Sequence, residues 1–325
     1  MKEQKFKILI AAGGSGGHLF PAQQMAMFFS DVVFAGHNLS KSPFFQKQFP
    51  HYDIAARAPN KLSFIFSTIK GLFQSLKLFS KYKIDIVVGF GSFHTFPVLL
   101  AATLLRKKMI LFEANCALGK VNRLFSPFAS KIAVQFPIPA KKTVFVPLLP
   151  WKARPKPVSK QDALSYFGLQ QAFTILIFGG SQGATFFNEI MPKAIDAQVI
   201  HFTGKGHARY TNGCVKEFET RMDLAYTAAD LVICRSGAST MAELICYGKP
   251  SLLIPFPYSS EDHQRENAKF FTEVVKGARM LDQKDATVAK IKEEIQLLRK
   301  DYSKYEKAIK EYDIGNRVEW IDLIK

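Results

Sequence analysis

The sequence predicts an α/β protein made of two Rossmann-like domains that face each other across a cleft. A short apolar segment, a glycine-rich loop and a helical segment follow one another in each half, with the loops at residues 13–17 and 179–184. A proline-rich passage at residues 137–157 separates the halves, as expected of a linker. The length of 325 residues suits two domains. We expect the division at residues 1–148 and 149–325.

The composition is that of a globular protein for which we expect no metal and no cofactor. Hydrophobic residues make up 48% of the chain and charged residues 22%, enough to bury large cores. No metal-ligand spacing and no DxD motif occurs. The apolar runs at residues 1–12 and 89–105 are too short for a signal peptide and a membrane span, respectively. Four cysteines form no CxxC pair and are expected to be reduced, buried thiols: Cys116, Cys214, Cys234 and Cys246.

The net positive charge is concentrated in the first half of the chain. The net charge is +17; residues 1–150 carry 19 basic and 5 acidic side chains, whereas residues 151–325 carry 25 and 22. Such a field attracts an anionic surface, either nucleic acid or phospholipid. Because no RNA-binding signature accompanies it, we expect a membrane surface and no nucleic acid.

The first half opens with a strand, a glycine loop and a helix. The apolar run at residues 6–12 leads into Gly13-Gly14-Ser15-Gly16-Gly17-His18 and then a helical segment. The spacing is not the GxGxxG of dinucleotide-binding proteins, so the loop is compatible with NAD, phosphate or sugar. We expect His18 to point into the cleft as a candidate base; a structural histidine is equally consistent with the sequence.

Residues 62–80 show the periodicity of an amphipathic helix. At roughly 100° per residue, their apolar side chains fall within one arc of about 140°. The arc contains Leu62, Ile65, Phe66, Ile69, Leu72, Phe73, Leu76 and Phe79. Lys70, Lys77 and Lys81 lie beside it. Either the apolar face packs on the sheet with the lysines in water, or it forms a lipid-facing surface with a basic rim.

Two further strands with polar or glycine-rich ends follow in the first half. A strand at residues 84–88 leads into Gly89-Phe90-Gly91-Ser92 and a helix. A strand at residues 109–112 ends at Glu113-Ala114-Asn115. We expect the carboxyl ends of these strands to meet at one edge of a parallel sheet, where ligands bind.

The second half repeats the pattern. A strand at residues 174–178 leads into Gly179-Gly180-Ser181-Gln182-Gly183-Ala184 and a helix. A strand at residues 198–203 leads into Gly204-Lys205-Gly206. From residue 291 to the end the sequence is charged and helical, and we assign it to the second domain.

Residues 230–256 predict a βαβ crossover that carries chemistry. A strand at residues 231–234 is followed by a turn of small residues, a helix stopped by Gly248, and a second strand. The helix N-terminus attracts phosphate because its N–H groups lack partners and its dipole is positive there. Glu243, one turn inside, can accept hydrogen bonds from a pair of sugar hydroxyls. Alternatively, Thr240 and Glu243 form a capping box.

In this order, the motifs resemble those of the MurG family, the peptidoglycan N-acetylglucosaminyltransferases of the GT-B fold, over nearly the whole chain. The matching motifs are GGSGGH at 13–18, Gly89-Phe90-Gly91, Glu113-x-Asn115, GGSQGA at 179–184, Gly204-Lys205-Gly206, CRSGAST at 234–240 with Glu243, and Asp262-His263-Gln264 with Asn267-Ala268. The chain departs from the family at Ala114, at Ser92, where glycine is usual, and at Lys152, where the family has arginine.

The resemblance implies a role for each matched position. His18 is the candidate base, and Glu243 takes the ribose hydroxyls. Uracil meets the backbone near Phe218 and Glu219. The sugar is contacted by Asn115 and Gln264. The remaining substrate-binding residues implied by the match are Ser15, Gly16, Gly17, Lys152, Ser181, Gln182, Gly237, Ala238, Ser239 and Thr240.

The resemblance implies an inverting transferase that moves GlcNAc from UDP-GlcNAc to the C4 hydroxyl of the MurNAc of lipid I, giving lipid II. It implies a peripheral position on the cytoplasmic face of the bacterial inner membrane, with other cell-wall synthesis proteins as possible partners. The alternatives are another GT-B glycosyltransferase, a UDP-GlcNAc epimerase, or a catalytically weakened cell-wall scaffold protein. The basic first half favours a lipid acceptor.

Overall fold

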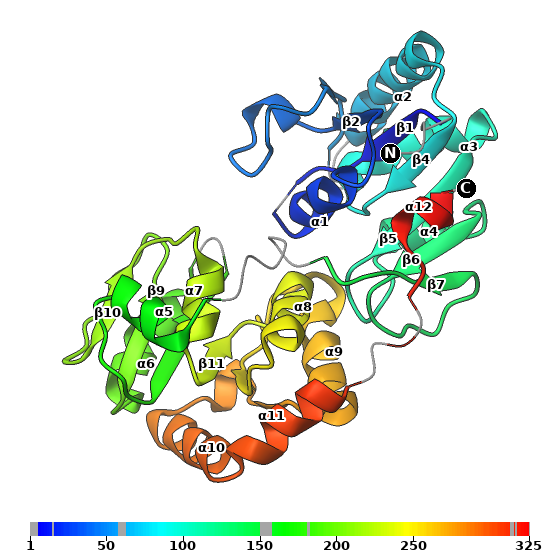
Figure 1. The fold of residues 1–325 in the computed structure, drawn as a ribbon. Helices are drawn as coiled ribbons and strands as arrows, with labels where there is room; N and C mark the ends of the chain where they lie inside the picture. The colour runs from blue at the N-terminus through cyan, green and yellow to red at the C-terminus, as the bar shows by residue number, and fades with distance from the viewer. Residues whose placement is uncertain are drawn as a thin grey trace. The chain divides into compact units, whose positions relative to one another are not determined.

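The computed structural model describes residues 6–14, 16–57, 63–149, 158–180, 183–312, 315 and 317–324. They form two α/β units (Figure 1). Unit 1 comprises Met1–Ala153 and Ile314–Lys325, and unit 2 comprises Arg154–Asp313. Each unit contains one sheet whose strand pairs are all parallel, so the predicted pair of parallel-sheet α/β domains is confirmed.

The sheet of unit 1 has the order β3-β2-β1-β4-β5-β6-β7. Its strands are β1 (Ile8–Ala11), β2 (Val32–Gly36), β3 (His51–Asp53), β4 (Ile86–Gly89), β5 (Lys108–Glu113), β6 (Lys131–Val134) and β7 (Thr143–Phe145). Alternate residues of β1 enter different cores: Ile8 and Ile10 pack with α1 (Gly16–Ala26), whereas Leu9 and Ala11 pack with α2 (Ser63–Tyr82), α3 (Phe96–Leu104) and α4 (Lys120–Phe125). The strand order reverses between β1 and β4, where open α/β sheets bind ligands.

The last helix differs from the expected assignment of residues 149–325 to one domain. In α12 (Trp320–Ile324), Trp320 is fully buried and packs in the core of unit 1 together with Leu323 and Ile324. Lys108 Nζ donates to the Ile324 carbonyl at 2.6 Å. The short apolar face of α12 therefore packs on the sheet of unit 1. The sequence does not reveal this contact, because α12 is far from that sheet along the chain.

The sheet of unit 2 has the order β10-β9-β8-β11-β12-β13. Its strands are β8 (Thr174–Phe178), β9 (Gln198–Phe202), β10 (Gly213–Lys216), β11 (Leu231–Cys234), β12 (Ser251–Leu253) and β13 (Ala278–Met280). Its helices are α5 (Lys160–Tyr166), α6 (Thr185–Ala194), α7 (Met222–Ala228), α8 (Ala238–Tyr247), α9 (His263–Lys269), α10 (Val288–Lys300) and α11 (Tyr302–Glu311). The order reverses between β8 and β11, and the predicted crossover is present as β11, α8 and β12. Gly248 ends α8 in the left-handed conformation, as predicted.

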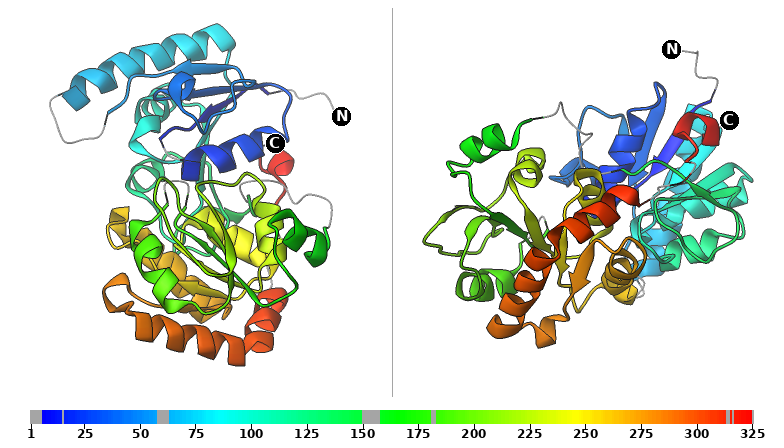
Figure 2. Two further views of the ribbon diagram at one scale, coloured as in Figure 1. Left: turned by 90° about the vertical axis from the view of Figure 1, so that its left-hand side faces the viewer. Right: turned by 60° about the horizontal axis from the view of Figure 1, so that its bottom comes forward.

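The amphipathic helix predicted over residues 62–80 is α2, seen at the margin of unit 1 in the left view of Figure 2. Leu62 lies outside the described residues, and the rest of the apolar arc divides between two environments. Phe79 is buried, and Leu72 and Leu76 pack against the core of unit 1. The other part of the arc is exposed: Ile65 by 55%, Phe66 by 73%, Ile69 by 48% and Phe73 by 61%. Among the described residues, no helix is long and apolar enough to cross a membrane.

Candidate active site

The glycine loops of unit 2 lie at the point where its strand order reverses. The loop after β8 and the turn after β11 are neighbours, because these two strands pair in parallel with Phe178 opposite Cys234. Gly183 has a φ of +74°, and a Cβ there would lie 2.2 Å from the Thr203 carbonyl oxygen, so only glycine fits. Ser181 and Gln182 lie outside the described residues.

The turn after β11 presents the start of α8. Gly237 is the N-cap and has no side chain to cap the helix, and the first helical hydrogen bond runs from Met241 N–H to the Gly237 carbonyl. The N–H groups of Ala238, Ser239 and Thr240 therefore have no partner within the helix. Together with the helix dipole, they make this turn suitable for a phosphate group.

Glu243 is buried beside this turn and bonded to a tyrosine. Its side chain is 7% exposed, and Oε2 accepts a hydrogen bond from the Tyr226 hydroxyl at 2.7 Å. Burial, with the nearby Glu243 carboxylate, raises the pKa of Tyr226 well above its usual value. The capping-box alternative is wrong, because Gly237 is the N-cap and Thr240 is the third helical residue.

Gln264 is tied to the same turn from α9. Its Oε1 accepts from the Phe256 N–H at 2.9 Å, and its carbonyl accepts from Ser236 Oγ at 2.6 Å. Asn267 Nδ2 donates to the Ser236 carbonyl at 2.9 Å. The residues before α9, Glu261 and Asp262, have φ values of 53° and 55°. These contacts connect the expected sugar-contacting residue to the expected phosphate turn.

Arg235 is a supporting residue to which the sequence analysis assigned no role. Its guanidinium is buried and donates to the Ile254 and Pro255 carbonyls at 2.9 and 3.1 Å, and to Gln283 Oε1 at 2.6 Å. Burial lowers the pKa of Arg235 to about 10. Its position within the CRSGAST motif is the only sequence signal for it. The partners are distant in the chain, so the role appears only in three dimensions.

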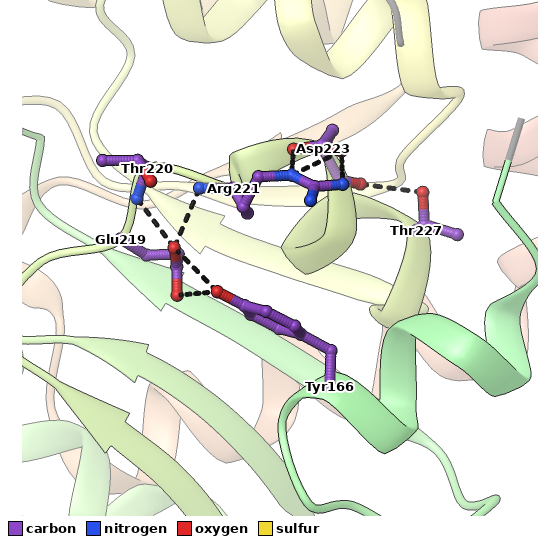
Figure 3. Close-up of polar contacts among 6 residues, drawn as sticks. All are labelled: Tyr166, Glu219, Thr220, Arg221, Asp223 and Thr227. Atoms are coloured by element: carbon purple, nitrogen blue, oxygen red, sulfur yellow. Dashed lines mark hydrogen bonds and ion pairs between the residues drawn. The ribbon is translucent and has the colours of Figure 1, made fainter. Parts of the chain in front are cut away.

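The Glu219 side chain is engaged within the protein, as Figure 3 shows. Its carboxylate accepts from the N–H groups of Thr220 and Arg221 at 2.8 and 2.9 Å, from Lys216 Nζ at 2.7 Å and from the Tyr166 hydroxyl at 3.3 Å. Burial alone would raise the pKa of Glu219, but these hydrogen bonds outweigh it and the pKa is lowered. The neighbouring Phe218 is 51% exposed.

In unit 1, His18 lies in the first turn of α1. Its ring is half-buried, and Nδ1 lies 2.8 Å from the Phe90 carbonyl oxygen after β4. A carbonyl only accepts, so Nδ1 carries the proton and Nε2 is the acceptor nitrogen. This is the tautomer that a general base on Nε2 requires. Gly16 is buried and Gly17 is exposed, while Ser15 lies outside the described residues.

Asn115 is fixed by the buried Glu113 at the end of β5. The Glu113 carboxylate accepts from Asn115 N–H at 3.1 Å, Asn115 Nδ2 at 3.0 Å, Gly119 N–H at 3.0 Å and Asn122 Nδ2 at 2.9 Å. These four bonds organise the loop that carries Asn115. Lys152 lies outside the described residues.

The predicted residues thus fall into two groups, one at the carboxyl edge of each sheet. Gly16, Gly17, His18 and Asn115 belong to unit 1, and Glu219, Gly237, Ala238, Ser239, Thr240, Glu243 and Gln264 belong to unit 2. Within the described residues, no group of three or more His, Cys, Asp or Glu side chains is placed to hold a metal ion. Unit 2 provides a helix N-terminus suited to an anion beside a buried carboxylate, and unit 1 provides an imidazole of defined tautomer.

Both halves of the chain match one family. Residues 8–134 match the glycosyltransferase family 28 N-terminal domain, and residues 174–319 match the glycosyltransferase family 28 C-terminal domain. The chain is also similar to the crystal structure of MurG from Acinetobacter baumannii, with a TM-score of 0.76 and 27% identity over 95% of both chains.

Relatives of similar length agree. A protein of Protochlamydia amoebophila is 37% identical over 90% of this chain and 87% of its own length. A protein of Chlamydia pneumoniae is 34% identical over 86% of each chain. Both are named UDP-N-acetylglucosamine--N-acetylmuramyl-(pentapeptide) pyrophosphoryl-undecaprenol N-acetylglucosamine transferase. This chain therefore belongs to the MurG family, within glycosyltransferase family 28.

Proposed function

We propose that this chain transfers GlcNAc from UDP-GlcNAc to the C4 hydroxyl of the MurNAc of lipid I, with inversion, giving lipid II and UDP. The observation that carries the proposal is the turn after β11, where a helix N-terminus suited to phosphate adjoins the buried carboxylate of Glu243. The identity of the substrates is proposed from the names of the relatives described above, which resemble the chain over most of its length.

The donor is held by unit 2. The diphosphate of UDP-GlcNAc accepts hydrogen bonds from the N–H groups of Ala238, Ser239 and Thr240. These groups stabilise the negative charge that grows on the leaving UDP. Glu243 accepts hydrogen bonds from the ribose hydroxyls, and Tyr226 holds the carboxylate in place. Gln264 contacts the transferred sugar.

The acceptor hydroxyl is activated by unit 1. His18 Nε2 takes the proton of the C4 hydroxyl as that oxygen attacks C1 of GlcNAc from the face opposite the diphosphate. The bond from C1 to the diphosphate oxygen breaks, and its electron pair leaves with UDP. The Phe90 carbonyl, bonded to Nδ1, stabilises the imidazolium that forms.

Product analysis tests this function. The full chain is incubated with UDP-GlcNAc and a short-chain lipid I analogue, and the mass of the lipid product is measured. We expect the lipid to gain one GlcNAc as UDP is released. Formation of UDP-ManNAc from the donor alone would indicate an epimerase, and failure to turn over would indicate a scaffold protein.

Glu243→Ala is expected to weaken UDP binding by about 1.5–3 kcal/mol, because hydrogen bonds to a charged acceptor are lost. Isothermal titration with UDP measures the loss. The matched control is Tyr226→Phe, which removes the hydroxyl bonded to Glu243 but keeps the carboxylate, and it should weaken binding less. A Glu243→Ala protein that binds UDP normally and only melts earlier would assign Glu243 a purely structural role.

We also propose that unit 1 docks reversibly on an anionic membrane surface at the cytoplasmic face of the inner membrane. The exposed part of α2 carries Ile65, Phe66, Ile69 and Phe73, and Lys70, Lys77 and Lys81 lie on the same helix. Apolar side chains that enter the bilayer contribute roughly 1.5–3 kcal/mol each when fully buried. Each basic residue near an anionic surface adds about 1 kcal/mol, screened by salt.

The double variant Phe66→Ser, Phe73→Ser is expected to lose at least tenfold in binding to anionic liposomes in a flotation assay. Both side chains are exposed, by 73% and 61%, so the fold should not change. Val274→Ser in unit 2, where the side chain is 55% exposed, is the matched control and should bind as wild type. A folded double variant that floats as wild type does would rule out insertion of this surface.

A further inference from the structure

Ser92 has a backbone conformation that residues with a side chain rarely adopt. It follows β4 with φ 70° and ψ 145°. Glycine reaches this region without steric cost, whereas a serine there is strained. Strained residues persist only where the surrounding structure enforces them, and they cluster at functional sites. Ser92 lies two residues after Phe90, whose carbonyl orients His18.

The Ser92 side chain forms a pair with His94. Its Oγ accepts weakly from the His94 N–H at 3.4 Å and lies 2.8 Å from His94 Nδ1. The hydroxyl keeps its own proton when it accepts from the backbone, so it can donate that proton to Nδ1. Thr95, fully buried, donates from Oγ1 to the Gly91 and Ser92 carbonyls, both at 2.9 Å. The turn is therefore held from both sides.

The His94 ring also packs on the glycine loop that precedes His18. A Cβ at Gly14 would lie 2.8 Å from His94 Nδ1, and a Cβ at Gly13 would lie 3.0 Å from His94 Cβ. His37 stacks on the His94 ring, with centroids 5.4 Å apart and an interplanar angle of 10°. Burial lowers the pKa of His94, and the nearby His37 and His18 lower it further, so the ring is neutral at neutral pH.

We propose that Ser92 and His94 are positioning residues that hold the glycine loop and the turn after β4 together, and thereby fix the direction of the His18 imidazole. One turn makes both contacts: the Phe90 carbonyl accepts from His18 Nδ1, and the Ser92–His94 pair supports Gly13 and Gly14. The strained serine provides a hydroxyl at this position, which glycine would not. This inference rests on the proposed role of His18 as the base.

Ser92→Gly is the central test. Glycine accepts the φ of 70° without strain, so the variant should melt at or above the wild-type temperature. It removes the hydroxyl bonded to His94, so kcat should fall on the order of tenfold through misalignment of His18, with KM for UDP-GlcNAc unchanged. A residue that matters only for stability would give the opposite result, with no loss of rate when its strain is relieved.

His94 variants and a control complete the test. His94→Ala should lower kcat as Ser92→Gly does, and the double variant should lose little more, since the two residues act as one unit. His94→Asn should recover most of kcat, because Asn Oδ1 occupies the position of Nδ1 and accepts from the Ser92 hydroxyl. The matched control is Lys276→Gly, at an exposed left-handed position of unit 2 with φ 57°, which should leave kcat unchanged.

A second measurement does not depend on turnover. In nitrogen-15 spectra of the full chain labelled at histidine, wild-type His18 should show the signals of a single tautomer protonated at Nδ1. Ser92→Gly should move them toward a mixture of tautomers. If the wild type forms no lipid II but these signals move, the proposed function is wrong and the positioning role holds. If Ser92→Gly leaves both kcat and the His18 signals unchanged, the positioning role is wrong.

Discussion

Replacing His18 with alanine is expected to lower kcat by about 10²–10⁴-fold while UDP binding stays intact, since general bases typically contribute this much. The Phe90 carbonyl accepts from Nδ1 at 2.8 Å, so Nε2 is the acceptor nitrogen of the neutral ring. The donor contacts that we propose lie in unit 2. The base is therefore needed for chemistry and not for donor affinity. Single-turnover kinetics with saturating UDP-GlcNAc and titration with UDP measure the two quantities separately.

The matched control for this prediction is His51→Ala. His51 also lies in unit 1, is half-buried, and holds a backbone carbonyl with Nδ1, that of Phe49 at 2.9 Å. Its loss should cost some stability and leave kcat within a factor of about two or three. If UDP affinity falls as much as kcat in His18→Ala, then His18 contacts phosphate or supports the loop, and another group is the base.

Acidification from pH 6.5 to pH 4 is expected to cost about 3 kcal/mol in free energy of unfolding through His201 alone. This histidine of β9 is fully buried, with Nδ1 2.9 Å from the Tyr210 hydroxyl, and burial lowers its pKa from 6.5 to about 4. The unfolded chain takes up a proton near pH 6.5, whereas the folded ring stays neutral. The stability is therefore fully present above pH 6.5 and is lost as the pH falls toward 4.

Urea unfolding of wild type and His201→Gln between pH 7 and pH 5 measures this contribution. Glutamine keeps a polar partner for Tyr210 but does not titrate, so its stability should depend less steeply on pH. The lower limit of the window matters because the pKa of Glu219 is depressed below 4.5, so its contribution is lost only below that pH. Equal pH slopes for the two proteins would contradict the assignment to His201.

The sequence determined the elements of this fold that have local signals. The central strands β1, β4, β8 and β11 are short apolar runs, glycine loops follow β1 and β8, and Gly248 marks the end of α8. The edge strands β3 and β10 are not apolar runs, and the sequence did not predict them. These signals locate the turn before α8, His18 and Glu243, because each of these features is defined by residues that are close together in the sequence. The presence of one parallel sheet in each half, with a glycine loop at the carboxyl end of a strand, follows from the same repeated pattern.

Tertiary structure alone decided what partners these residues have. The bond from Tyr226 to Glu243 joins residues on two helices. The groups bonded to Arg235 come from the segment after β12 and from Gln283. A period of 3.6 residues shows that α2 has an apolar arc, but it does not show how much of the arc the core covers. In the structure Phe66 is exposed and Phe79 is buried. Likewise, α12 packs on unit 1, and the sequence did not show this because the strands that cover Trp320 are distant in the chain. Contacts between remote segments depend on how the elements pack, and no local pattern encodes them.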